Sequence, residues 1–202
     1  MTKSPSFLKV APGVVTWCIY SKECKTDCFG HAVAHQGNLV LIDPILPGSL
    51  EIWNKIMKLG TPNLILLTNG NHERHALKIA DEYGLPLGAG IEAVSELSKK
   101  PQIILDGQVK MQGLRPMPCP GAGPGETALY SESTKTLILG DSVINLPETG
   151  LQLLPDKYCK DPAQLKKSLA TLLNLNFEQL LMAHGIPLTD DPKRELRKLL
   201  RS

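Results

Sequence analysis

Residues 64–76 read LILLTNGNHERHA, and this stretch decides the fold of the chain. Residues 64–67 form a continuous apolar run without polar alternation, which is typical of a strand covered on both faces. The turn-forming residues 68–71 then interrupt the run. Apolar residues return at helical spacing from Ala76 and stop at Gly84, where a helix is expected to end. The polar residues in between are therefore expected at the C-terminal end of a central strand, where open α/β sheets bind ligands.

Length and composition indicate an ordinary globular protein. The 202 residues are 42% hydrophobic and 21% charged, and we expect one domain spanning residues 1–202. The formal net charge of +2 argues against a nucleic-acid partner. The sequence has neither the ~20 apolar residues of a membrane span nor a signal-peptide core, so we expect no membrane partner. The five cysteines, an odd number, then predict reduced thiols and a cytoplasmic location.

Hydrophobic patterning along the chain alternates strand pairs with strand–helix units. Strands are predicted at residues 14–20, 31–35, 39–42, 64–67, 87–88, 127–130, 136–139 and 179–182, with two short strands around 106–107. Helices are predicted at 47–59, 73–83, 91–98, 162–173 and 193–201, the last with a solvated basic face. Residues 21–30, 116–125 and 145–160 are predicted as loops. With no linker or composition break, this pattern predicts a single α/β domain.

Polar side chains follow one predicted strand after another. Asp43, the segment 69–75, Asp141 and His184 all come directly after apolar runs. Each alone fits a capping or turn role. Together they indicate a site at one edge of the sheets. His31 and His35, at even spacing, are expected on one face of a strand, at the surface or hydrogen-bonded within the sheet.

Five motifs in order resemble the metallo-β-lactamase fold superfamily, which includes glyoxalase II-like thioesterases and related hydrolases. They are LVLIDP, LLTNGNHERH, PGAGPGE, LILGDS and MAHG, and the match covers roughly residues 14–187. The resemblance implies a four-layer αββα sandwich in a single domain of mixed α/β (α+β) class. It also implies a site at the edge between two β-sheets.

The resemblance implies two metal ions bound by the motifs T-H-x-H-x-D-H and P-G-H-T-x-G, together with a bridging aspartate and a last histidine. The aspartate is present as Asp141 and the last histidine as His184. When the first motif is aligned on Thr68, the other ligand positions are occupied by Asn69, Asn71, Glu73, Arg74 and Ala122. Asparagine is a weak neutral donor for zinc, alanine offers no donor, and arginine stays protonated. Most of the metal site is therefore replaced.

Three readings of the site follow from these residues. In the first, the dinuclear site is dismantled and the protein binds no cofactor. It is then a binding or structural protein, or one with altered chemistry. A buried carboxylate needs compensation, so the guanidinium of Arg74 would neutralise Asp141 in place of the metal. Asp43, at the end of its strand, would brace the loops around the site.

In the second reading, His72, Asp141 and His184 hold a single zinc, iron or manganese ion, with His75 as a further donor. The protein is then a hydrolase of thioester, ester or lactone substrates. In the third, a metal-free enzyme uses His72, Glu73 or Asp141 as acid or base. The ligand is a small molecule in each case. The sequence contains no motif that specifies it.

Overall fold

The apolar run that opens the deciding stretch is the end of a central strand in the computed structural model, which describes residues 6–108 and 110–201. This strand, β5, belongs to a seven-stranded sheet in the order β1-β2-β3-β4-β5-β6-β7. The strands are β1 Phe7–Ala11, β2 Val14–Ser21, β3 Thr26–His35, β4 Asn38–Ile42, β5 Thr61–Leu66, β6 Leu87–Ala89 and β7 Ile103–Ile104. The first four strands are antiparallel, and β4 to β7 run parallel.

A second sheet is built from the later part of the chain, in the order β13-β10-β9-β8. Its strands are β8 Leu114–Pro118, β9 Thr127–Ser131, β10 Thr136–Leu139 and β13 Gln179–Met182. The outer pair β10 and β13 is parallel, with Leu139 opposite Met182. A small hairpin of β11 Val143–Leu146 and β12 Gly150–Leu153 lies beside this sheet.

Alternating side chains of β4 show why the molecule has four layers. Leu39 and Leu41 pack against the helices, in one core with Trp53 and Ile56. The intervening residues Val40 and Ile42 face the other way, into a core shared with the second sheet. A strand segment buried on both faces has to be apolar, and the buried residues 39–42 of β4 are all apolar.

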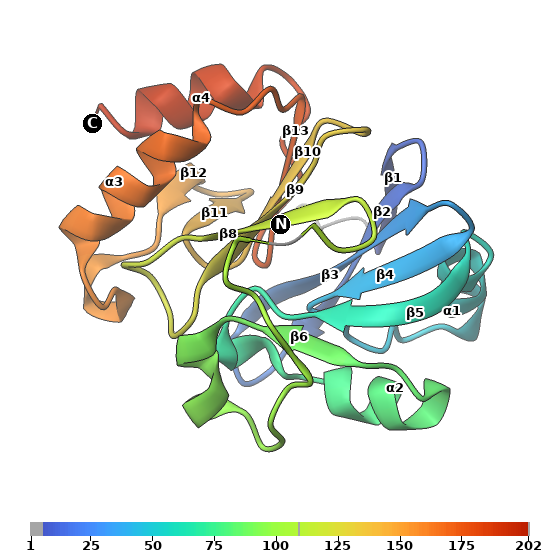
Figure 1. The fold of residues 1–202 in the computed structure, drawn as a ribbon. Coiled ribbons are helices and arrows are strands. Elements are labelled where there is room, and N and C mark those ends of the chain that lie inside the picture. The colour runs from blue at the N-terminus through green and yellow to red at the C-terminus, as the bar shows by residue number, and fades with distance from the viewer. Residues whose placement is uncertain (1–5, 109, 202) are drawn as a thin grey trace.

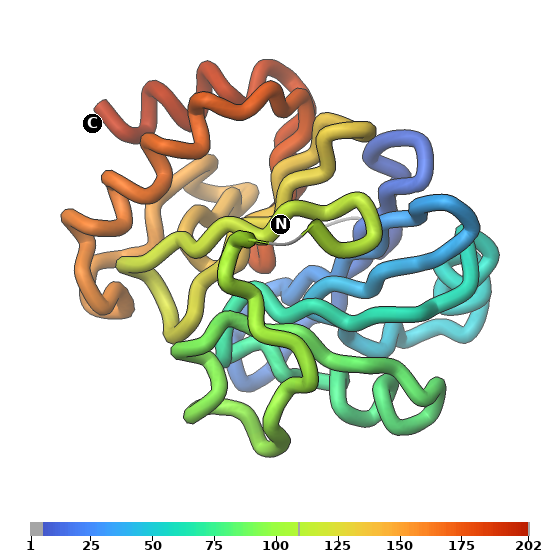
Figure 2. Tube along the Cα trace, viewed as in Figure 1, coloured from blue at the N-terminus to red at the C-terminus, as the bar shows by residue number. Residues whose placement is uncertain are grey.

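Helices cover the outer face of each sheet, which gives the order αββα (Figure 1). The first sheet is covered by α1 Leu50–Met57 and α2 Ala76–Tyr83, and the second by α3 Pro162–Leu172 and α4 Pro192–Leu199. The 3-10 turns are η1 Gly70–His72, η2 Ile91–Glu96 and η3 Asp156–Tyr158. Figure 2 shows the early, blue-to-green part of the chain in one half of the sandwich and the yellow-to-red part in the other. The predicted α/β sandwich fold is confirmed.

Several local predictions were wrong. The loop predicted at 116–125 starts later, because β8 extends to Pro118 and pairs with β9. Strand β3 already begins at Thr26, inside the predicted loop 21–30, because residues 26–30 pair with β2 down to the turn. Part of the predicted loop 145–160 forms the β11–β12 hairpin. The helix predicted from residue 73 starts only at Ala76, because Arg74 has φ +41° and cannot join a right-handed helix. Among the described residues, no helix has the length and apolarity needed to cross a membrane.

Candidate metal centre

Two pairs of parallel strands, one in each sheet, deliver the polar side chains to a common edge. In the first sheet, β4 and β5 end in register at Ile42 and Leu66, so Asp43 and the turn that carries His72 emerge side by side. In the second sheet, β10 and β13 end in register at Leu139 and Met182. Asp141 and His184 each lie two residues beyond those ends, and the fold brings them together with His72.

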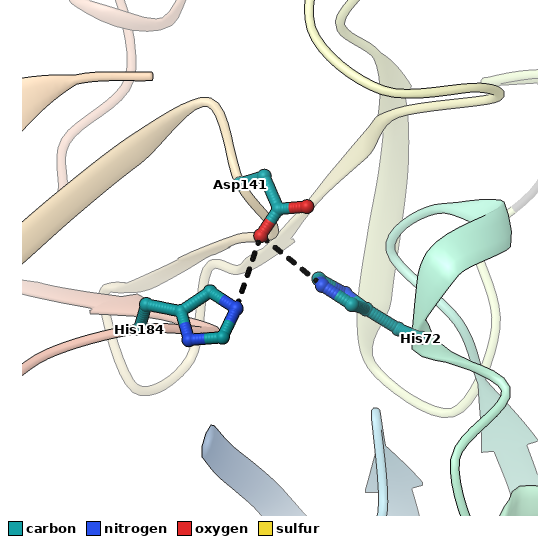
Figure 3. A group of neighbouring side chains, drawn as sticks. All are labelled: His72, Asp141 and His184. Atoms are coloured by element: carbon teal, nitrogen blue, oxygen red, sulfur yellow. Dashed lines mark hydrogen bonds and ion pairs between the residues drawn. The ribbon is translucent and has the colours of Figure 1, made fainter. Parts of the chain in front are cut away.

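His72, Asp141 and His184 form a compact cluster, and Figure 3 shows the carboxylate of Asp141 between the two imidazole rings. Oδ1 of Asp141 lies 3.1 Å from Nε2 of His72 and 3.5 Å from Nε2 of His184. One ligand atom from each residue lies within 4.8 Å of the others, a spacing that could hold a metal ion. The side chains of Asp141 and His184 are 14% and 15% exposed, so the cluster reaches solvent on their side.

His72 is buried between two carboxylates. Its Nδ1 lies 3.0 Å from Oδ2 of Asp43 and 2.9 Å from Oγ1 of Thr68, whose hydroxyl also donates to Asp43. Burial alone would lower the pKa of His72. The negative charges of Asp141 and Asp43 outweigh it and raise the pKa to about 9. The same attraction to His72 overcomes burial at Asp43 and Asp141 and holds the pKa of each below its usual range.

His184 is oriented by the backbone of β3. Its Nδ1 lies 3.0 Å from the carbonyl oxygen of Asp27, so this nitrogen carries the proton and donates it. Burial lowers the pKa of His184, which favours the neutral ring. The unprotonated Nε2 and the Oδ1 atom of Asp141 then direct lone pairs at each other across 3.5 Å. Two facing acceptors are a suitable arrangement for a cation between them.

Glu126 is a site residue that the sequence prediction missed. Its buried carboxylate accepts hydrogen bonds from the backbone N–H and the hydroxyl of Ser142 and from the side-chain amide of Asn69. The same amide of Asn69 donates to Oδ2 of Asp141 at 3.2 Å. Burial, followed by repulsion from Asp141, raises the pKa of Glu126. A signal existed in the sequence, since Glu126 ends the quoted PGAGPGE motif, but only the fold shows that it is buried.

Gly140 leaves the space in which this network forms. A Cβ atom at Gly140 would lie 2.9 Å from both carboxylate oxygens of Glu126 and 2.6 Å from Oγ1 of Thr68. Any larger residue would therefore displace the hydroxyl that braces Asp43 or the carboxylate that binds Asn69. The glycine that precedes Asp141 is thus required by close packing rather than by its backbone dihedral angles.

The remaining predicted residues lie around this cluster without joining it. Glu73 turns away and accepts from the backbone N–H and the hydroxyl of Ser98 at 2.6 and 2.7 Å. Asn71 is exposed, and its backbone N–H donates to the side-chain oxygen of Asn69 at 2.9 Å. Ala122 is buried in the core of the second sheet. His75 precedes α2, where its Nδ1 accepts from the backbone N–H of Leu46 at 3.3 Å.

The ion pair predicted between Arg74 and Asp141 is wrong. Asp141 contacts His72, His184 and Asn69 instead, and it forms no ion pair with Arg74. The guanidinium of Arg74 donates through Nη1 to the carbonyl oxygen of Phe29 at 2.8 Å. His72 therefore supplies the compensating group, because the last residue of the turn η1 contacts the carboxylate and Arg74, two residues further on, does not.

His31 also departs from the prediction. It is fully buried on β3, and neither ring nitrogen has a hydrogen-bond partner that meets ordinary geometry. Burial lowers its pKa to about 4; the charge of Asp43 opposes this shift, and the smaller effect of Arg74 adds to it. A neutral, buried imidazole of this kind packs behind the site and does not reach the cluster of His72, Asp141 and His184.

The chain is similar to a known protein family in sequence and to solved structures in fold. The family model described as the metallo-beta-lactamase superfamily matches residues 8–202. A crystal structure of the DIM-1 metallo-beta-lactamase exposed to ceftazidime aligns with a TM-score of 0.78 at 15% identity, covering 99% of both chains. A metallo-beta-lactamase from Pontibacter korlensis aligns with a TM-score of 0.77 at 17% identity, covering 97% of this chain and 98% of that one. No curated protein sequence matches this chain.

Proposed function

The chain belongs to the metallo-β-lactamase superfamily, and from that premise we propose that it is a hydrolase that works with one divalent metal ion rather than two. The ion would be held by Nε2 of His72, Oδ1 of Asp141 and Nε2 of His184. The observation that carries the proposal is that Nε2 of His184 lies 3.5 Å from Oδ1 of Asp141 while Nδ1 of the same ring is bonded to the carbonyl oxygen of Asp27. Two imidazoles and one carboxylate, open to solvent on one side, are a donor set for zinc or iron(II).

The contacts made by Nδ1 of each histidine support the same metal ligands. Metal-binding histidines generally donate their second nitrogen to a carboxylate or a carbonyl, which fixes the tautomer and the ring direction. His72 meets Asp43 through Nδ1, and His184 meets the carbonyl of Asp27 through Nδ1. Both Nε2 atoms are left to face the cluster. These contacts preorganise the site before any ion enters.

A second ion is disfavoured by the residue that replaces a family ligand at position 69. Asn69 is fully buried and uses its amide N–H groups on Glu126 and Asp141, so its positive end faces those carboxylates. Its oxygen is engaged by the backbone N–H of Asn71. Ala122, at the position of another family ligand, carries no donor atom. The hydrogen-bond network of Asn69 thus fills the place of the second ion.

The chemistry of the centre fits hydrolysis of a carbonyl compound such as a thioester, an ester or a lactone. A divalent ion in such a site polarises a carbonyl group and lowers the pKa of water to about 7. The chain's own contribution is orientation: Asn69 holds Oδ2 of Asp141, which leaves Oδ1 directed at the two histidines. Glu73 is held by Ser98 and is not placed to act as an acid or base.

A metal-free role is the second candidate. Its supporting observation is the pKa of His72, raised to about 9, which places an imidazolium between Asp43 and Asp141 at neutral pH. That cation would balance the two carboxylates without a metal. The protein would then bind a small molecule and catalyse no hydrolysis through a metal.

Metal content separates the two candidates. The untagged protein, expressed with zinc supplementation and measured by elemental mass spectrometry, should hold close to one ion per chain. His184→Ala should lose that ion, and His75→Ala is the matched control, because His75 is a half-buried histidine outside the cluster. A chelator should lower the melting temperature of the wild type but not that of His184→Ala. Background metal in all three proteins, with no effect of chelator, would favour the metal-free role.

A further inference from the structure

Arg74 has a backbone conformation that residues other than glycine rarely adopt. It lies between η1 and α2 with φ +41°, in the left-handed region that long side chains seldom occupy. Such strained conformations are found disproportionately at functional sites. The strain delays the start of α2 and carries the side chain to β3, where Nη1 donates to the carbonyl oxygen of Phe29.

One edge of β3 places this guanidinium beside the metal centre. The carbonyl of Phe29 accepts from Arg74, and the carbonyl of Asp27, two residues earlier, accepts from His184. Carbonyls two residues apart on a strand point to the same side and are separated by about 7 Å. The backbone N–H of Phe29 donates to Ala183 on that same side. Arg74 and His184 therefore stand next to each other along one edge, a single strand repeat apart.

Among residues 6–108 and 110–201, the guanidinium of Arg74 has one hydrogen-bond acceptor, the carbonyl oxygen of Phe29. It has five N–H donors, and the bond to Phe29 uses one of them. Arg74 forms no ion pair with any carboxylate among the described residues, although its side chain is half-buried. Its positive charge nevertheless reaches the cluster, where it contributes to the lowered pKa of Asp141 and of His184. A planar cation with free donors is suited to a carboxylate or a phosphate.

We propose that Arg74 recognises an oxyanion, either a carboxylate or a phosphate, and so selects anionic acyl substrates over neutral ones. The anion would contact the guanidinium while the reacting carbonyl group lies at the neighbouring cluster of His72, Asp141 and His184. The substrate class rests on the proposed hydrolase function. The anion site itself does not, because it is formed by the guanidinium of Arg74, which the carbonyl oxygen of Phe29 holds in place.

Anion binding can be measured without metal or turnover. Calorimetric titration of the chelator-treated protein with inorganic phosphate and, separately, with glutarate should show binding of at least one anion. Arg74→Gln should raise the dissociation constant at least tenfold, which is about 1.4 kcal/mol. Arg74→Lys should fall between the two, since an ammonium keeps the charge but not the planar fork. Arg115→Gln is the matched control, because Arg115 is a half-buried arginine stacked over Tyr130.

Arg74→Gly is a second variant that keeps the test decisive if Arg74→Gln misfolds. Glycine adopts φ +41° without strain, and the change removes the whole side chain. This variant should bind the anion as weakly as Arg74→Gln while melting no lower than the wild type. The anion with the lower dissociation constant, phosphate or glutarate, identifies the group that the guanidinium binds. Equal affinity in the wild type, Arg74→Gln and Arg74→Gly would overturn the proposal. So would a failure of the wild type to bind either anion at millimolar concentration.

Turnover gives a second, independent readout with the zinc-loaded protein. Two esters serve as substrates, 4-nitrophenyl pentanoate and mono-4-nitrophenyl glutarate. Their acyl chains differ only at the end, where the first has a methyl group and the second a carboxylate. Arg74→Gln should raise KM about tenfold for the glutarate ester and leave the pentanoate ester unchanged. An equal loss on both esters would overturn the proposal. Absence of hydrolysis by the wild type would instead count against the hydrolase function, and the calorimetry would still decide the anion site.

Discussion

Oδ2 of Asp43 lies 3.0 Å from Nδ1 of His72, and both side chains are buried. The other oxygen of Asp43 accepts from the backbone N–H of Thr68 at 2.8 Å, while Oδ2 also accepts from the hydroxyl of Thr68. The histidine is therefore held as a donor through Nδ1 and presents Nε2 to Asp141. Asp43 has φ +46°, a conformation that asparagine also tolerates.

Asp43→Asn tests this orientation. The asparagine oxygen would remain with Thr68 and its NH₂ group would face Nδ1 of His72, which favours the tautomer protonated at Nε2 and removes the ligand lone pair. We expect the zinc dissociation constant to rise about 10- to 100-fold, as measured by competition with a chromogenic chelator. Asp81→Asn, at an exposed aspartate paired with Lys99, should leave it unchanged. Equal zinc affinity in both variants would show that Asp43 does not orient a ligand.

Zinc affinity should depend steeply on pH. In the metal-free protein the pKa of His72 is raised to about 9, so below that pH an incoming ion has to displace a proton. The apparent affinity should fall about tenfold for each pH unit below 9, and should level off above it. Chelator competition between pH 7 and pH 10 measures the slope. A flat profile would mean that His72 is not a ligand.

Asn69→Asp should destabilise the protein. The substitution keeps the shape of the side chain but removes the N–H groups that bind Glu126 and Asp141, and it adds a third negative charge between them. We expect a loss of about 3 kcal/mol in the free energy of unfolding, measured by urea denaturation at pH 7. Asn174→Asp, at an exposed position, should cost little. Similar losses in the two variants would contradict the bridging role of Asn69.

His31 should weaken the fold at acid pH. In the unfolded chain a histidine takes up a proton near pH 6.5, whereas burial lowers the pKa of His31 to about 4 in the folded state. The unfolded state therefore binds more protons in this interval, and stability is lost as the pH falls from 6.5 towards 4. Between pH 7.5 and pH 5 this amounts to about 2 kcal/mol.

His31→Leu should remove that loss, so the variant should keep more of its stability than the wild type when urea denaturation is repeated at the two pH values. His35→Leu, on the same strand but half-buried, is the control and should follow the wild type. If His31→Leu shows the full acid loss of the wild type, other groups cause the pH dependence.

The apolar runs predicted a single α/β domain, and the position of polar residues after those runs indicated the site. The αββα sandwich followed from the resemblance of five motifs to the metallo-β-lactamase superfamily. It could not predict which residue of the segment 69–75 enters the site. That choice depends on the 3-10 turn at His72 and on the positive φ of Arg74, and neither leaves a pattern in residue type. Glu126 was missed for a related reason, since a glutamate after a glycine-rich loop is ordinarily solvated. Its burial arises from contacts with Ser142 and Asn69, which are distant in sequence.

Backbone carbonyls, rather than side chains, anchor both Arg74 and His184 to β3. Every amino acid supplies the same carbonyl, so positions 27 and 29 can change residue type during evolution without loosening either anchor. A single inserted or deleted residue between the β2–β3 turn and Gly30 would be far more damaging, because it would rotate the carbonyls to the opposite edge of the strand. Natural variation at this edge should therefore be rich in substitutions and nearly free of length changes.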